Sequence, residues 1–91
     1  MENRRAVVSV LGKDQVGIIA KVTTVLSEKE INVLDINQTI VEDFFTMMMI
    51  VDVTQIEDLD SVRQTLNEIG EELGVKINLQ LEEVFQAMHR I

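Results

Sequence analysis

The stretch RAVVSVLGKDQVGIIAKVTTVLSEKEINVLDI, residues 5–36, decides the fold of this chain of 91 residues. It opens with Arg5 to Leu11, a short β-branched segment that is apolar on both faces and predicts a buried central strand. Gly12 to Gly17 predicts a turn. The apolar residues from Ile18 to Leu26 recur at helical spacing, which predicts an amphipathic helix, and Asp14 is expected to cap its start.

Two further strands are predicted after residue 31. Asn32 to Val41 alternates between apolar and polar residues, which predicts a strand with one face in solvent. Glu42 and Asp43 form a tight connection to Phe44–Val53, a strand that is almost wholly apolar. In the strand that begins at Asn32, the expected apolar face holds Leu34, Ile36 and Ile40, and the expected polar face holds Asp35, Asn37 and Thr39.

The remainder of the chain predicts a helix, a strand and a tail helix. Apolar residues from Leu59 to Leu73 step by three and four, with Asp58 or Asp60 near the start and Gly74 at the end. Val75 to Leu81 alternates, which predicts the fourth strand. Acidic residues then lead and basic residues trail a short apolar stripe, the charge order of a short C-terminal helix. The stripe consists of Val84, Phe85, Met88 and Ile91.

The order strand-helix-strand-strand-helix-strand predicts an α+β protein of the ferredoxin-like type. Each helix joins two strands that must run parallel to each other, and such crossovers are right-handed. The economical arrangement is a βαββαβ sandwich, a four-stranded antiparallel sheet with both helices on one face, followed by a short C-terminal helix. No linker interrupts the sequence, so one domain is expected over residues 1–91, with a core at 5–81 and a helical tail at 82–91.

The first and third strands are apolar on both faces, which predicts self-association. Because two helices cover only one face of a sheet, the other face would expose a large apolar patch. The tail helix, a second chain or both must cover that patch. We therefore expect a homo-oligomer, most simply a two-fold dimer. In the first strand, Val7 and Leu11 are expected to face opposite to Ala6, Val8 and Val10. In the third strand, Met48 and Ile50 are expected to face opposite to Met47, Met49 and Val51.

Composition narrows the classes of function. The chain has 16 acidic and 8 basic residues, net -8. This argues against nucleic acid and anionic membranes as partners, since both require clustered cations. Residues 1–29 hold five basic and three acidic side chains, so small anions are steered weakly toward this third. Cysteine is absent, which excludes disulfides and thiolate metal sites. With no signal-peptide motif and no membrane-spanning apolar run, the expected location is cytoplasmic.

The glycine turn is the candidate binding site. It is not a Walker loop, because Gly17 is followed by Ile18 rather than by lysine and a hydroxyl residue. Its two glycines also fall short of the three in a dinucleotide fingerprint. Free N–H groups at a helix start can bind a carboxylate, and Asp14 beside them could bind an ammonium group. The pair would suit an α-amino acid, while a plain strand-to-helix connection remains the alternative.

Two quoted stretches carry a resemblance to a known family. Gly-Lys-Asp-Gln-Val-Gly-Ile at 12–18 and Ser-Glu-Lys-Glu-Ile-Asn-Val at 27–33 resemble the ACT domain, and the likeness covers residues 5–81. The tail from Val84 to Ile91 is similar to that of small stand-alone bacterial ACT proteins, which are related to the glycine cleavage system transcriptional repressor. The resemblance implies the βαββαβ sandwich and the binding of amino acids at domain interfaces.

The resemblance also implies ligand contacts. The loop would supply backbone groups, and Asn32 would bind ligand across the interface. Alternatively, Asn32 has only a structural role, as the residue at which the chain leaves the helix. Val16 stands where the family usually has proline, and Glu30 where it usually has glycine. If the family backbone is kept, Glu30 has a positive φ. The implied ligand-binding set is Gly12, Lys13, Asp14, Gln15, Val16, Gly17, Ile18 and Asn32.

The pattern holds no legible catalytic or metal site. His89 is the only histidine, and the three methionines at 47–49 must point alternately to opposite faces of a strand. We expect no cofactor and no enzymatic activity. The predicted function is a regulatory module, a homodimer that binds an amino acid or a similar small carboxylate and is read by a partner protein. The alternative is a ligand-free interaction module.

Overall fold

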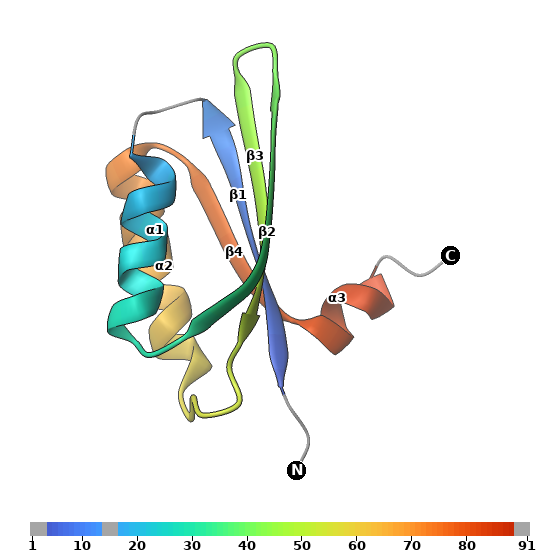
Figure 1. Ribbon diagram of the computed structural model, residues 1–91. Coiled ribbons are helices and arrows are strands. Elements are labelled where there is room, and N and C mark those ends of the chain that lie inside the picture. Colours follow the sequence, from blue (N-terminus) through green and yellow to red (C-terminus); the bar gives the residue numbers. More distant parts are fainter. Residues whose placement is uncertain (1–3, 14–16, 89–91) are drawn as a thin grey trace.

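The computed structural model describes residues 4–13 and 17–88 and contains four strands and three helices (Figure 1). Their order is the one predicted from the sequence, and the ends differ by a residue or two. In chain order the elements are β1 Arg5–Lys13, α1 Ile18–Glu28, β2 Asn32–Val41, β3 Phe44–Asp52, α2 Leu59–Leu73, β4 Lys76–Leu81 and α3 Glu82–Met88.

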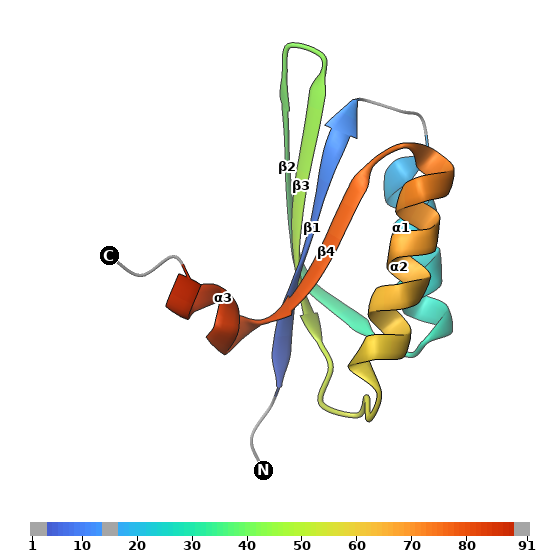
Figure 2. The same cartoon turned by 180° about the vertical axis from the view of Figure 1, so that it is seen from behind.

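The strands form one antiparallel sheet in the order β2-β3-β1-β4. Helices α1 and α2 lie against one face, and α3 lies on the opposite side (Figures 1 and 2). We call these two sides the helix face and the open face. The predicted ferredoxin-like βαββαβ sandwich with a C-terminal helix is confirmed.

The two ends of the sheet lie far apart. β1 and β2 each pair antiparallel with β3, so they run in the same direction, from a lower to an upper end in Figure 1. Eight steps along β1 at about 3.3 Å per residue separate the two ends by roughly 27 Å. The lower end consists of Arg5, Asp52 and Asn32, and the upper end of Lys13, Phe44 and Val41.

The hydrophobic core lies between the sheet and the two long helices. Alternate residues of β1, β3 and β4 point into it, and the matching stripes of α1 and α2 close it from the other side. Burying an aliphatic side chain of this kind is worth about 1.5–3 kcal/mol. Sheet residues with almost no exposed surface are Ala6, Val8, Val10, Met47, Met49 and Val51, and the helices add Ile18, Val22, Leu26, Val62 and Leu66.

The ends of α2 follow the sequence prediction. The Asp58 carboxylate accepts a hydrogen bond from the Ser61 N–H at 3.1 Å, which caps the start of the helix. Gly74 ends it in the left-handed conformation with φ 72°. Glu30 has φ 61°, so the predicted positive φ after α1 is confirmed. Glu42, in the β2–β3 turn, has φ 55°, which no sequence pattern predicted.

The prediction for β2 was only partly right. Its bounds are as expected, but all ten residues are exposed, so the strand has two solvent-facing sides rather than one. β2 is the outermost strand of the sheet, and the upper part of the β2–β3 hairpin extends past α1 and α2 (Figure 1). Ile36 and Ile40 face the helix side, opposite Met49 and Phe45, yet remain 43% and 56% exposed. A β-bulge at Leu34 interrupts the pairing near the lower end.

The base of α3 contacts one part of the open face. It contacts β1 and β4, and Arg5 Nη2 lies 2.8 Å from Glu82 Oε1 across this contact. Val7 faces the open side and is only 4% exposed. Leu11, Phe44 and other apolar residues nearer the upper end stay exposed, so the tail helix alone does not cover the patch.

Candidate functional site

The first half of the predicted ligand loop belongs partly to the sheet. Gly12 and Lys13 are the last two residues of β1 and pair with Phe45 and Phe44, which corrects the predicted turn at these positions. A Cβ on Gly12 would lie 2.5 Å from Cγ1 of Val75, so glycine is required here by packing against the chain before β4. Packing against Val75 therefore explains the glycine at position 12 without any ligand.

Gly17 is the N-cap of α1 with φ 90°, and no side chain of residues 4–13 and 17–88 caps the helix start. The prediction that Asp14 is the N-cap was therefore wrong. Asp14, Gln15 and Val16 lie outside the described residues. A Cβ on Gly17 would have no atom within 4 Å, so the backbone conformation, and not crowding, requires glycine.

The start of α1 can present backbone donors. Lys21 N–H donates to Gly17 C=O at 2.9 Å, which closes the first helical turn. The N–H groups of residues 18–20 precede this bond and therefore have no acceptor within the helix. A helix start of this kind attracts carboxylates. The Ile18 side chain is 1% exposed and packs into the core, so Ile18 can offer a ligand only its backbone.

Asn32 lies at the other end of the sheet. It opens β2, is exposed, and pairs with Asp52, whose other neighbour in the sheet is Arg5. Gly12 and Lys13 lie at the upper end, roughly 27 Å away at about 3.3 Å per residue. Within one chain the structure therefore brings together Gly12, Lys13, Gly17 and Ile18, but not Asn32.

Hydrogen bonds fix the lower end around Asn32. The Asp52 carboxylate accepts from the Thr54 N–H at 2.8 Å, and Thr54 Oγ1 accepts from the Arg4 N–H at 2.9 Å. Hydrogen bonding by the Thr54 hydroxyl, and then by its N–H, lowers the pKa of Asp52 below its usual value. Asp52 thus stays a carboxylate next to Asn32 over the whole physiological pH range.

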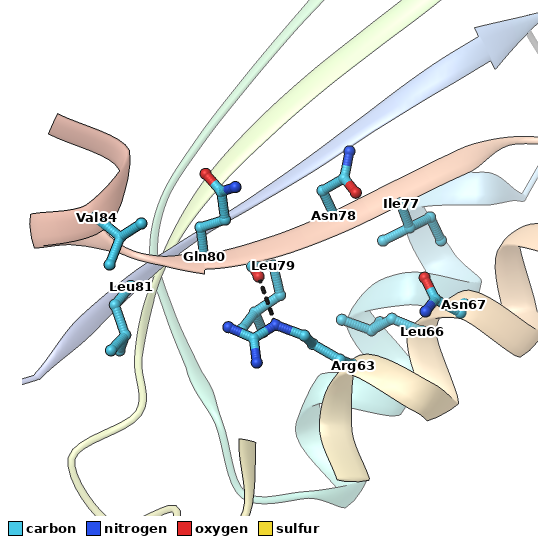
Figure 3. A pocket seen from close by; sticks show the side chains of 9 residues that line it. All are labelled: Arg63, Leu66, Asn67, Ile77, Asn78, Leu79, Gln80, Leu81 and Val84. Atoms are coloured by element: carbon cyan, nitrogen blue, oxygen red, sulfur yellow. Dashed lines mark hydrogen bonds between the residues drawn. The ribbon is translucent and has the colours of Figure 1, made fainter. Parts of the chain in front are cut away.

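A groove between α2 and the outer edge of β4 was not predicted (Figure 3). It has a volume of about 300 Å³ and lies between Arg63 and Leu66 of α2 and the strand residues Ile77 to Leu81. Arg63 Nε donates to Leu79 C=O at 2.9 Å, and Arg63 Nη1 donates to Asp60 at 2.9 Å. In the sequence Arg63 looks like an ordinary solvent-facing helix residue, so no pattern could have revealed the groove.

The described part of the chain offers no obvious chemistry beyond these features. In residues 4–13 and 17–88, no three His, Cys, Asp or Glu side chains are placed to hold a metal ion. Over the same ranges, no helix is long and apolar enough to cross a membrane. The groove contains one guanidinium that is already bound to a carbonyl and a carboxylate, not an acid–base pair.

Comparison with known proteins identifies the family. The family model of the ACT domain matches residues 4–80. The chain belongs to the ACT domain family. A UPF0237 protein of Listeria innocua is 51% identical over 88 residues, which are 96% of this chain and 99% of the relative. ACT domains are typically small-molecule-binding regulatory modules.

Solved structures support the same assignment for this ACT domain. An ACT domain protein from Streptococcus pneumoniae superposes with a TM-score of 0.83 and 36% identity, over 97% of this chain and all 100% of the other. A putative glycine cleavage system transcriptional repressor superposes with a TM-score of 0.77 over 89% of this chain and 47% of its own. At 18% identity that second likeness is one of fold alone.

Proposed function

We propose that this ACT domain binds a free amino acid, or a similar small carboxylate, as a homodimer with a regulatory and non-enzymatic role in the cytoplasm. The observation that carries the proposal is the position of Asn32, at the opposite end of the sheet from Gly17. Two halves of a site this far apart cannot hold one small molecule within a single chain. A second chain is needed to complete the site.

Antiparallel pairing of two β2 strands would bring the halves together. β2 is an edge strand, it is exposed along its whole length, and it carries Val33, Ile36 and Ile40 as exposed apolar residues. A two-fold axis perpendicular to the sheet reverses the second copy, so its lower end lies beside the upper end of the first. Asn32 of each chain then lies near the partner's β1–α1 loop. We call this arrangement the edge dimer.

The chemistry of the completed site suits an α-amino acid. The N–H groups at the start of α1 would bind the carboxylate, and the open space around Gly17 leaves room for it. The Asn32 side chain of the partner would accept from the ammonium group or donate to the carboxylate. Lys13 and the loop residues Asp14, Gln15 and Val16 complete the proposed contacts.

Regulation follows from a ligand that contacts two chains at once. A molecule that binds only the assembled dimer stabilises that arrangement over the separated chains, and a partner protein can read the shift in population. The matching experiment is a thermal unfolding screen against the twenty amino acids. A ligand present at 100 times its dissociation constant should add about 2.7 kcal/mol to the free energy of unfolding.

Mixing two variants tests whether the site is shared between chains. Asn32→Ala and Asp14→Ala should each abolish the ligand-induced stabilisation when measured alone. In a mixed dimer, the intact loop of the Asn32→Ala chain meets the intact Asn32 of the Asp14→Ala chain, so one site in two is restored. Random exchange in an equimolar mixture makes about half of the dimers mixed, so isothermal titration calorimetry should give about a quarter of the wild-type stoichiometry at wild-type affinity.

Asn67→Ala is the matched control, because Asn67 is an exposed amide on α2, away from both halves of the proposed site. It should leave ligand binding unchanged. If mixing restores nothing although each variant is folded, the site is not shared. If no amino acid stabilises the wild-type protein at millimolar concentration, the ligand-free interaction module becomes the better explanation.

A further inference from the structure

The open face retains a cluster of exposed apolar side chains, around the polar Thr46, that α3 does not cover. Leu11, Phe44 and Met48 point to this side and are 51%, 53% and 37% exposed. They lie on the adjacent strands β1 and β3, in the middle and upper part of the sheet. A patch of neighbouring large apolar side chains marks an interaction surface, unlike single apolar residues scattered over a protein.

The geometry of α3 indicates what lies on this surface. α3 begins directly after β4 and projects away from the open face instead of lying along it (Figures 1 and 2). Its seven residues span about 10 Å at 1.5 Å per residue. Two sheets that pack face to face are also about 10 Å apart. The helix therefore has the length needed to reach a second sheet laid over the open face.

The charges of the open face indicate which protein supplies the second sheet. Lys13 and Lys76 lie toward the upper end, where Lys76 pairs with Leu11. The acidic residues Asp35, Glu82 and Glu83 lie toward the lower end or on α3. Glu82 already contacts Arg5, whereas Glu83 is exposed and forms no ion pair within the described ranges. On the β4 side of the face, Lys76 therefore lies toward the upper end and Glu83 toward the lower end, whereas Glu42 and Asp43 stand on the β2–β3 turn, on the β2 side of the sheet.

A surface with this polarity is complementary to its own copy. A two-fold axis that lies in the interface and crosses the strands places the upper end of one copy over the lower end of the other. Lys76 of each chain then faces the partner's Glu83 on α3, and Leu11 faces the base of the same helix. A copy in the parallel orientation would instead oppose lysine to lysine and glutamate to glutamate, which costs association energy.

We propose that two copies of this chain pack open face against open face in this antiparallel orientation, with α3 of each copy holding the upper end of the partner's sheet. This contact needs no ligand and goes beyond the proposed amino-acid site. Its axis is perpendicular to that of the edge dimer, so the two contacts use different surfaces, and where the axes intersect they close an assembly of four chains.

Charge reversal tests the contact directly. Lys76→Glu and Glu83→Lys should each raise the dissociation constant of the face-to-face contact by about tenfold, because two exposed ion pairs per interface become like-charge pairs. The double variant, Lys76→Glu with Glu83→Lys, should return to the wild-type value. Sedimentation equilibrium over a dilution series measures all three. Glu68→Lys, an exposed charge change on α2 in the helix layer, is the matched control and should have no effect.

Leu11→Glu is a second variant that places a charge in the middle of the apolar surface. It should abolish the face-to-face contact, so that sedimentation shows particles of half the wild-type mass, with the circular dichroism spectrum of the folded protein retained. The proposal is overturned if Lys76→Glu leaves association unchanged, or if the added Glu83→Lys fails to restore it. Neither outcome depends on ligand binding. If the protein binds an amino acid but the charge rescue fails, only the face-to-face contact is contradicted and the proposed amino-acid site is not.

Discussion

The two edge strands of the sheet differ in how the chain treats their outer backbone. β4 has six residues, buries Ile77 and Leu79 against α2, and has its outward Leu79 C=O bound by Arg63 Nε at 2.9 Å. β2 has ten residues and all are exposed. The chain binds one outer carbonyl of the β4 edge with its own Arg63 and leaves the longer, more apolar β2 edge open.

An open edge of that kind is a liability in a protein that works alone, because it can pair with any exposed strand. β2 carries only two of the devices that block such pairing, and both lie near its lower end. These are the bulge at Leu34 and the Asp35 carboxylate, which accepts from the Ile36 N–H at 2.9 Å. Its upper half carries neither device and is open to pairing, and in the edge dimer that half lies beside the lower half of the second copy's β2.

Among the variants at the two edges, Ile36→Lys on β2 should have the largest effect, which is a loss of association through this edge. Ile36 lies near the middle of β2, so in the edge dimer it lies close to the two-fold axis and near its own copy. Two lysines there would repel across the paired strands. We expect the dissociation constant of the edge dimer to rise about a hundredfold, equivalent to about 2.7 kcal/mol, and the amino-acid response to be lost with it.

Sedimentation equilibrium and thermal unfolding with ligand measure these two effects. Thr24→Lys is the control for the added charge, because Thr24 is exposed on α1 and distant from both edges. It should leave association and ligand response unchanged. If Ile36→Lys associates as the wild type does, β2 is not the dimer edge, and the shared site proposed for Asn32 has no structural basis.

Arg63→Ala should have a smaller effect at the other edge. It removes the hydrogen bond to Leu79 C=O and leaves that carbonyl to water or to another strand. Because the Arg63 side chain is 41% exposed, solvent screening brings the expected loss below the range for a charged hydrogen bond, to about 1 kcal/mol in the free energy of unfolding measured with urea. The freed edge should also increase concentration-dependent aggregation.

Asp60→Ala is the matched control for Arg63→Ala. It removes only the exposed ion pair of Arg63 and leaves the bond to Leu79 in place. The free energy of unfolding should change by less than about 0.5 kcal/mol. Equal destabilisation by both variants would show that the bond to the strand contributes nothing of its own.

The sequence predicted the fold well because each element carries a local signal. Two-sided apolar strands, helical spacing in α1 and α2, and the Asp58 and Gly74 end signals together leave few alternatives. The prediction for β2 failed on one point, since alternation of polar and apolar residues does not reveal where the helix layer ends. Ile36 and Ile40 alternate correctly and face the helix side, yet they remain 43% and 56% exposed.

The candidate site was less predictable. Spacing in the sequence suggested that Gly12 belongs to a loop, whereas the structure shows a strand residue whose Cβ would meet Val75, a contact between residues 63 positions apart. No local pattern encodes such a contact. The separation of Asn32 from Gly17 likewise depends on strand direction, and it becomes visible only when the sheet is assembled.

The turns that flank the two edges differ in the residues they hold at positive φ. Both turns around β2 contain a glutamate there, Glu30 at 61° and Glu42 at 55°, whereas the turn before β4 has Gly74 at 72°. A side chain with a Cβ is strained in this region by about 1–2 kcal/mol, and glycine is not. Glu30→Gly should relieve the strain but add flexibility to the unfolded chain, which costs about 0.5–1 kcal/mol.

The net change expected for Glu30→Gly is therefore between zero and about 1.5 kcal/mol of added stability, measured by urea unfolding. Glu28→Gly is the matched control, because Glu28 is an exposed glutamate two residues earlier, in the last turn of α1. There glycine has no strain to relieve and should destabilise by about 0.5–1 kcal/mol. Because the two stability changes are expected to have opposite signs, their comparison isolates the contribution of backbone strain at Glu30. If both variants lose stability equally, the left-handed exit from α1 stores no strain, and the start of β2 at Asn32 is held by the sheet alone.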